Sequence, residues 1–147
     1  MQSGIVTKSC IHFGGDGLLG LDMSNEKNPV GWFEVPAKDL SRAFQFYESV
    51  LEVKLTLEEM GPTKMAMFPH SMNGHGAGGA LVQGEGYIPS HEGASVYFSV
   101  TDIPKTLDRV TSNGGKVLLP KMNIGQYGYI ATFEDCEGNR VSLHSLT

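Results

Sequence analysis

Hydrophobic positions follow two different periods along the chain, and the change of period predicts where helices and strands alternate. From Leu40, apolar residues recur 3, 4, 7, 10 and 11 positions later, and Asp39 stands directly before them as an N-cap. A second apolar stripe begins at Ile103, after Asp102 and with Pro104 in its first turn. We therefore expect two amphipathic helices, each capped by an aspartate and each packed on a sheet.

Short runs rich in β-branched and aromatic residues surround both helices, and turn residues separate them. The runs expected to be strands are 32–36, 53–57, 64–68 and 80–83 in the first half, and 95–99, 116–119, 128–133 and 140–144 in the second. Asn113-Gly114-Gly115 should end the second helix, because glycine adopts the left-handed conformation found at helix ends. Each half then has the order βαβββ.

An offset of 63 residues relates the two halves. It places Asp39 on Asp102 and Leu40 on Ile103, and the polarity classes agree along the repeat although identity is low. A sheet covered by one helix leaves its other face open, and pairing two such modules encloses a cleft. We predict an α+β fold of two tandem βαβββ modules, about 29–90 and 91–147, with curved sheets around a cleft that holds the function.

Residues 1–28 differ in character from the rest and are expected to be an N-terminal extension to a domain over 29–147. The segment lacks the pattern of a signal or transit peptide. The alternative is an arm whose β-prone stretch, 5–13, pairs with a sheet edge.

Composition and charge narrow the classes of partner. The 147 residues, 40% of them apolar, suit one domain, and no apolar run is long enough to span a membrane. A formal net charge of −5 disfavours nucleic acid and anionic membrane surfaces, so a small organic molecule, neutral or cationic, is the expected partner. Cys10 and Cys136 fit no disulfide framework or zinc motif, which favours reduced thiols and a cytoplasmic location.

Four segments carry a resemblance to a known family. They are VPAKDLSRA and FYESVL at 35–43 and 46–51, NGG at 113–115, and FEDCEGNR at 133–140. From about residue 29 to 147 the chain resembles the vicinal oxygen chelate superfamily of glyoxalases, bleomycin-resistance proteins and extradiol dioxygenases. The resemblance implies the fold predicted above and a homodimer in which modules of two chains can build each cleft. It does not select a reaction, because such folds serve many.

The metal-dependent members of that family place ligands on the first and last strands of each module. Counting from the first helix cap and the last turn, with the repeat offset, gives four positions here: Trp32, Gly79, Ser95 and Ser142. None offers a usable ligand, so no cofactor is expected and a metal-dependent glyoxalase I activity is doubtful. A register shift of two residues would bring in Glu34, Tyr97 and His144, and a divalent metal held by them is the alternative.

Glu34 is the strongest candidate for chemistry. It shares a strand face with Trp32 and is expected to point into the cleft. There it would act as a general base, with a pKa raised by burial beside Trp32, or as an anionic anchor for a cationic ligand. The alternative is a structural carboxylate paired with Arg140 or Arg42.

His144 and Tyr97 are the other catalytic candidates. His144 lies two residues beyond Ser142 on the last strand and could relay a proton. The alternative is a structural histidine near the terminus whose hydrogen bonds are made within the protein. Tyr97 is the counterpart of Glu34 in the repeat and could orient a substrate oxygen, or simply pack. If the two sheets of one chain face each other, Glu34 and His144 could act as base and acid.

The remaining cleft positions are expected to bind substrate: Trp32, Ser95, Ser142, Tyr127 and Tyr129. Flat aromatic rings suit a planar or cationic ligand, but core packing is favoured for at least one tyrosine of the Tyr127/Tyr129 pair. The glycine-rich stretch 69–93 is expected to form a lid, and a surface metal site at its three histidines is the alternative: His70, His75 and His91.

Four functions remain open from the sequence, and the last of them is a structural partner protein whose cleft is inert. The leading hypothesis is a glyoxalase-related protein that binds a small molecule and acts as a metal-independent lyase or isomerase by acid-base chemistry. The second is a resistance-type protein that sequesters its ligand without turnover. The third is a metal-dependent enzyme of the lactoylglutathione lyase or dioxygenase type.

Overall fold

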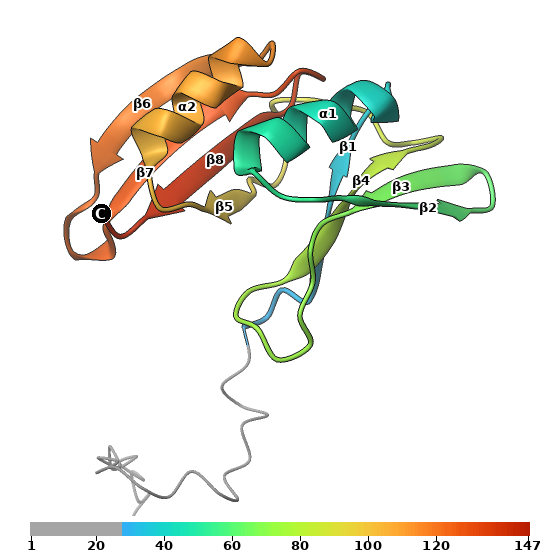
Figure 1. Ribbon diagram of the computed structural model, residues 1–147, viewed down its shortest axis with the longest axis horizontal. Helices are drawn as coiled ribbons and strands as arrows, with labels where there is room; N and C mark the ends of the chain where they lie inside the picture. The colour runs from blue at the N-terminus through green and yellow to red at the C-terminus, as the bar shows by residue number, and fades with distance from the viewer. Residues whose placement is uncertain (1–27) are drawn as a thin grey trace, which may run out of the picture.

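The computed structural model describes residues 28–147, so nearly all of the expected extension, 1–28, lies outside the described part of the chain. Figure 1 shows the elements in their chain order. They are β1 (Trp32–Pro36), α1 (Leu40–Leu51), β2 (Thr56–Met60), β3 (Thr63–Met67), β4 (Gly78–Gln83), β5 (Tyr97–Ser99), α2 (Ile103–Ser112), β6 (Lys116–Asn123), the short 3₁₀ helix η2 (Gly125–Tyr127), β7 (Tyr129–Glu134) and β8 (Arg140–Ser145).

The strands form two four-stranded mixed sheets of the same topology. Their orders are β1-β4-β3-β2 and β5-β8-β7-β6. In each sheet the first strand of the module runs parallel to the last, and the remaining pairs are antiparallel. The predicted α+β fold of two tandem βαβββ modules is therefore confirmed.

Both helices begin at the predicted aspartates. Asp39 Oδ1 accepts a hydrogen bond from Arg42 N at 3.1 Å, and Asp102 Oδ1 accepts one from Lys105 N at 3.0 Å. Each carboxylate thus satisfies a backbone N–H that the first helical turn leaves free. Gly114, with φ 90°, follows the end of α2, as the sequence predicted.

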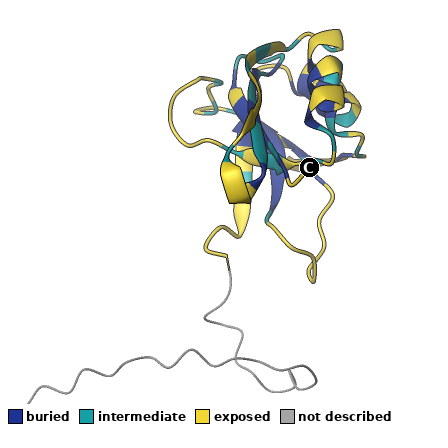
Figure 2. Cartoon of the chain, turned by 90° about the vertical axis from the view of Figure 1, so that its left-hand side faces the viewer, coloured by how far each residue is buried: buried dark blue, intermediate teal, exposed yellow. Residues whose placement is uncertain are grey.

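The two helices lie side by side, and the covered faces of both sheets share one core with them (Figure 1). Arg109 Nε of α2 donates to Val50 O of α1 at 2.9 Å, and the rings of Phe46 and Phe133 lie 6.2 Å apart. Buried positions accordingly gather on the strands and on one side of the helices, while most connecting loops are exposed (Figure 2). Because the helices occupy the space between the modules, the helix-free faces of the two sheets point away from each other. Within residues 28–147, the two sheets therefore do not enclose a cleft between their helix-free faces.

The turn between β7 and β8 ties the second module to the first. Asn139 Nδ2 donates to Pro36 O at 2.7 Å, at the end of β1. Glu137 accepts hydrogen bonds from the backbone of Lys38 and Asp39 at the start of α1 and pairs with Arg42 at 2.8 Å. The relative placement of the two modules is therefore fixed by hydrogen bonds as well as by apolar packing.

Several expected segments differ from the structure. β5 begins at Tyr97, two residues later than predicted, and β6 runs to Asn123, four residues further than predicted. β2 begins three residues later than predicted, because Leu55 belongs to the connection from α1, where it is buried and its N–H binds Glu48 Oε1 at 2.9 Å. The stretch 69–93 is not one lid, since β4 runs through its middle in the centre of the first sheet. No helix in the part of the chain described, 28–147, has the length and apolar character needed to cross a membrane.

Candidate functional site

Glu34 and Trp32 lie on the helix-free face of β1, because their neighbours Phe33 and Val35 pack into the shared core. Both carboxylate oxygens of Glu34 accept hydrogen bonds. Oε2 accepts from the hydroxyl of Tyr87 at 2.9 Å, and Oε1 accepts from Trp32 Nε1 at 3.4 Å. The two donors hold the carboxylate in one orientation.

Neither structural partner considered for Glu34 pairs with it. Arg42 is engaged by Glu137, and among residues 28–147 Arg140 makes no ion pair with Glu34, although both line a hollow of about 220 Å³. Glu34 is exposed, so the burial beside Trp32 that we expected is not found. The hydrogen bond to the Glu34 carboxylate, and the charge of that carboxylate, raise the pKa of Tyr87 above its ordinary value.

A hollow of about 640 Å³ opens between the edge strands β1 and β5. Trp32 and Glu34 line it from the first module, and Ser95 and Tyr97 line it from the second. Trp32 and Tyr97 remain 40% and 51% exposed, so their rings are available to a ligand. Four predicted site residues are therefore brought together here.

His144 lines a neighbouring hollow of about 420 Å³ with Tyr127, Tyr97 and Ser99. Its Nε2 lies 2.6 Å from the carbonyl oxygen of Tyr127, so that nitrogen must carry the proton in this contact. Tyr97 and Ser99 line both hollows. Glu34 and His144 thus lie in adjoining hollows and do not face each other across one cleft.

Ser142 and Tyr129 are not available to a ligand, for different reasons. Ser142 lies on the helix-free face beside Tyr97, as expected, but it is buried. Ser142 is only 2% exposed, and its Oγ lies 3.0 Å from Thr132 Oγ1. Tyr129 packs against the shared core with Lys121 Nζ 4.2 Å above its ring, so it differs from Tyr127, which is exposed. Successive residues of a strand point to opposite faces of the sheet, and Tyr129 points to the core face.

The residues at the four counted positions, Trp32, Gly79, Ser95 and Ser142, offer no imidazole, thiolate or carboxylate to a divalent ion. Trp32 uses its only polar hydrogen on Glu34, and Ser142 is hydrogen-bonded to Thr132. Gly79 is on the other side of the sheet, where a Cβ would overlap the ring of Phe33, and the helix-free positions beside it are Gly78 and Ala80. Within residues 28–147, no three His, Cys, Asp or Glu side chains gather as a metal site requires. The three loop histidines do not converge either: His70 packs on Gly78 and His91 pairs with Glu134 at 2.6 Å.

Sequence reasoning missed Tyr87 as the residue that holds Glu34. The two lie 53 residues apart, on a strand and on a loop. Tyr87 packs beside the helix-free cluster of Met65, Ala80 and Val82, which aims its hydroxyl at β1. Nothing in the local pattern around Tyr87 indicates this contact.

Residues 30–143 match the family model of the Glyoxalase/Bleomycin resistance protein/Dioxygenase superfamily. The chain belongs to this superfamily. A "Glyoxylase-like domain-containing protein" of Didymella fabae is 30% identical over 116 residues, which are 75% of this chain and 88% of that relative.

Solved structures of the superfamily share the fold of this member. Glyoxalase I from Zea mays aligns with a TM-score of 0.61 at 23% identity, over 80% of this chain and 46% of the maize chain. A glyoxylase/bleomycin resistance protein/dioxygenase domain from Frankia sp. EAN1pec aligns with a TM-score of 0.63 at 17% identity, over 81% of this chain and 98% of that one. This chain therefore spans about half the length of the maize protein and nearly all of the Frankia domain.

Proposed function

We propose that this glyoxalase-superfamily member binds a small organic cation on its helix-free faces, with the carboxylate of Glu34 as the anchor. The observation that carries the proposal is the pair of donors on Glu34: Tyr87 and Trp32 orient the carboxylate toward an open hollow. A carboxylate that already accepts from two donors is better suited to hold a positive charge than to remove a proton from carbon.

The surroundings of Glu34 suit a flat cationic ligand. Trp32 and Tyr97 present exposed rings to the same hollow, and aromatic faces attract cations through their quadrupole. The formal net charge of −5 over the whole chain also attracts a cationic ligand at long range.

The complete site would need a second copy of the chain. The helix-free faces diverge within one chain, and they carry exposed aromatic side chains: Trp32, Tyr97 and Tyr127. A homodimer that brings the helix-free face of one module against that of another would cover these rings and enclose the ligand. Such enclosure matters because a closed apolar wall strengthens the ion pair to Glu34.

The test compares a planar cation with a planar neutral molecule. We expect 9-aminoacridine, which is cationic at pH 7.5, to bind more tightly than acridine, which is neutral there. Glu34→Gln should lower the affinity for 9-aminoacridine by about ten-fold or more, because it removes a charged hydrogen-bond partner. It should leave the affinity for acridine unchanged. Isothermal titration calorimetry measures both affinities.

Glu58→Gln is the matched control, since Glu58 is an exposed glutamate on the edge strand β2 of the same sheet. It should change neither affinity. Tyr87→Phe should weaken 9-aminoacridine less than Glu34→Gln does, because the charge remains and only its orientation is lost. Equal affinity of 9-aminoacridine for the wild type and Glu34→Gln would contradict the proposal.

Acid-base catalysis is the second candidate, and one observation favours it. Tyr97 and Ser99 join the hollow of Glu34 to the hollow of His144, so one elongated ligand could touch both groups. Glu34 would take a proton from a carbon beside a carbonyl group and His144 would return one. The test measures turnover of a mixture of methylglyoxal and glutathione. Turnover that Glu34→Gln abolishes, and that persists when a metal chelator is added, would support this lyase chemistry. Turnover that the chelator abolishes would support the metal-dependent alternative instead.

A further inference from the structure

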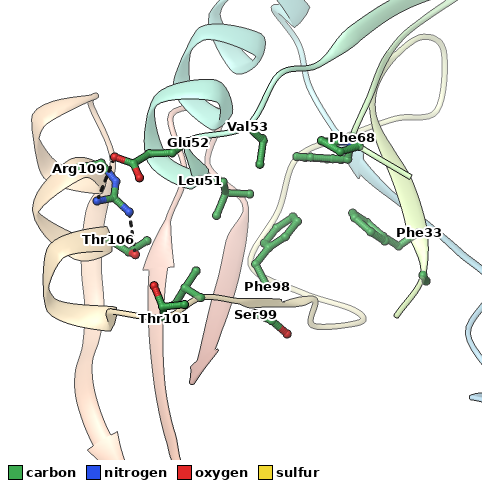
Figure 3. A pocket seen from close by; sticks show the side chains of 13 residues that line it. Phe33, Leu51, Glu52, Val53, Phe68, Phe98, Ser99, Thr101, Thr106 and Arg109 are labelled. Atoms are coloured by element: carbon green, nitrogen blue, oxygen red, sulfur yellow. Dashed lines mark hydrogen bonds and ion pairs between the residues drawn. The ribbon is translucent and has the colours of Figure 1, made fainter. Parts of the chain in front are cut away.

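A separate cavity of about 500 Å³ lies between the two modules, at the end of α1 and beside α2 (Figure 3). Three phenylalanine rings form one side of it, with centroids 5.3 to 5.6 Å apart: Phe33, Phe68 and Phe98. Leu51 and Val53 continue the apolar wall. The volume falls in the range of small-molecule sites, and a ligand here would remove apolar surface from water.

The opposite side of the cavity carries a fixed guanidinium group (Figure 3). Arg109 Nε donates to Val50 O at 2.9 Å, and Nη2 donates to the Oγ1 of Thr106 at 3.1 Å. Thr106 is 1% exposed and its hydroxyl donates in turn to Asp102 O at 2.8 Å. The chain of bonds fixes the plane of the guanidinium, so its remaining nitrogen has a defined direction.

That remaining nitrogen, Nη1 of Arg109, has only a loose partner. Glu52 Oε1 lies 3.7 Å away, and the side chain of Glu52 is 70% exposed. An ion pair of this length and exposure contributes little stability. A better-placed carboxylate could therefore replace Glu52 at Arg109 with little loss.

The backbone of Glu52 is unusual as well. Its φ of 54° is the left-handed conformation, and within residues 28–147 no other residue except glycine adopts a positive φ. Glycine is the usual residue at this point after a helix, because a side chain there is strained. The chain instead places at the cavity mouth a carboxylate that can swing out into water.

We propose that this cavity binds a small apolar carboxylic acid. The ligand's carboxylate accepts from Arg109 Nη1 and displaces Glu52 into solvent, while its aromatic or branched aliphatic body lies against the three phenylalanine rings. A cation is disfavoured by the fixed guanidinium, and a neutral molecule gains only the apolar contact. Phe33, Phe98 and Ser99 line both this cavity and the hollow of Glu34, but Arg109 and Glu52 line only the cavity. The inference therefore does not depend on the function proposed for Glu34.

The experiment uses three probes that share one body and differ in charge: 4-phenylbutyrate, 4-phenylbutanamide and 4-phenylbutylamine. Amide chemical shifts of the full-length ¹⁵N-labelled protein report where each probe binds and with what affinity. We expect 4-phenylbutyrate to shift amides of residues 51–53 and 100–101 in a saturable way. It should bind at least five-fold more tightly than the amide or the amine.

Two variants test the roles of the charged pair. Glu52→Gln leaves Arg109 in place and removes the carboxylate that competes with the ligand for it. The affinity for 4-phenylbutyrate should therefore rise two-fold to five-fold, and the affinity for the amide should not change. Arg109→Gln should weaken 4-phenylbutyrate at least ten-fold. Arg140→Gln removes an exposed arginine at the start of β8, which does not line the cavity, and is the matched control with no expected change.

The inference fails under three results. Equal affinities of the acid and the amide would show that Arg109 does not select the ligand. Shifts confined to residues outside the cavity would place the site elsewhere. Unchanged or weaker 4-phenylbutyrate binding in Glu52→Gln would contradict the exchange of carboxylates even if Arg109→Gln did not fold.

Discussion

The hydroxyl of Tyr47, on α1 of the first module, donates a 2.6 Å hydrogen bond to Oδ2 of Asp135, on the turn after β7 of the second. Tyr47 is fully buried and Asp135 is 2% exposed. Asp135 also accepts from the backbone of Glu137 and from the backbone and side chain of Asn139. The contact therefore connects a helix of one module to the turn that ties the two modules together.

Removal of the Tyr47 hydroxyl should destabilise the whole domain. In Tyr47→Phe one of the four hydrogen bonds to the buried Asp135 carboxylate is lost and the ring remains. We expect the free energy of unfolding to fall by about 1.5 to 3 kcal/mol, as for a hydrogen bond to a charged group. Urea denaturation measures it, with Tyr97→Phe, at a half-exposed tyrosine, as the control. Equal stability of the two variants would show that the bond contributes nothing.

The same contact predicts how stability depends on alkaline pH. Burial first, and then the negative charge and hydrogen bond of Asp135, raise the pKa of Tyr47 well above 10.0. The native state therefore holds this proton more tightly than the unfolded state. Its contribution to stability is complete below about pH 10, the ordinary tyrosine pKa, and is lost progressively as pH rises above it.

Phenolate absorbance checks this expectation. Of the five tyrosines, Tyr47 should ionise only when the protein unfolds, as judged by circular dichroism in the same titration. The Tyr47→Phe variant should lose the phenolate signal that accompanies unfolding. A Tyr47 signal that appears before the circular dichroism changes would contradict the assignment.

Gly79 should not tolerate a side chain. It lies on the central strand β4, and a Cβ there would overlap the ring of Phe33, which contacts two other phenylalanines. Gly79→Ala should lower the free energy of unfolding by about 1 to 3 kcal/mol, because a packed core must shift to make room. Gly31→Ala has open space and should change it by less than about 0.5 kcal/mol. Thermal or urea unfolding compares the two, and a tolerant Gly79 would mean that Phe33 is free to move.

Cys136 should be an unreactive thiol. Burial, followed by the charges of Asp135 and Glu137, raises its pKa to about 12. At pH 8 the thiolate fraction is then about a thousand-fold below that of an ordinary cysteine, and alkylation should slow accordingly. Mass spectrometry of the Cys136 peptide after iodoacetamide treatment measures the rate, against N-acetylcysteine as the reference. Alkylation should become fast in urea, and fast alkylation of the native protein would contradict the raised pKa.

Local patterns in the sequence were sufficient for the elements and for their order along the chain. Asp39 and Asp102 cap their helices because a side-chain oxygen next to free backbone N–H groups needs no distant partner. The repeat of 63 residues predicted that both halves have the element order βαβββ, and they do. Alternation along a strand also predicted that Glu34 and Trp32 share a face, opposite Phe33.

The same patterns could not predict contacts between segments far apart in the chain. Tyr87 holds Glu34 from a loop, and the hydroxyl of Tyr47 reaches Asp135 across 88 residues. Core packing was favoured for at least one of Tyr127 and Tyr129, but the sequence did not say which, because that depends on the strand register to within one residue.

The sequence by itself determined two capped helices, two βαβββ modules and the strand faces that carry the candidate residues, because these follow from periodicity and from hydrogen bonds between near neighbours. Only the tertiary structure decided that the helices pack together between the modules, so that the helix-free faces diverge and Glu34 and His144 lie in separate hollows. The direction in which two amphipathic modules meet depends on many weak contacts between residues far apart in the chain. A local sequence pattern does not specify those contacts.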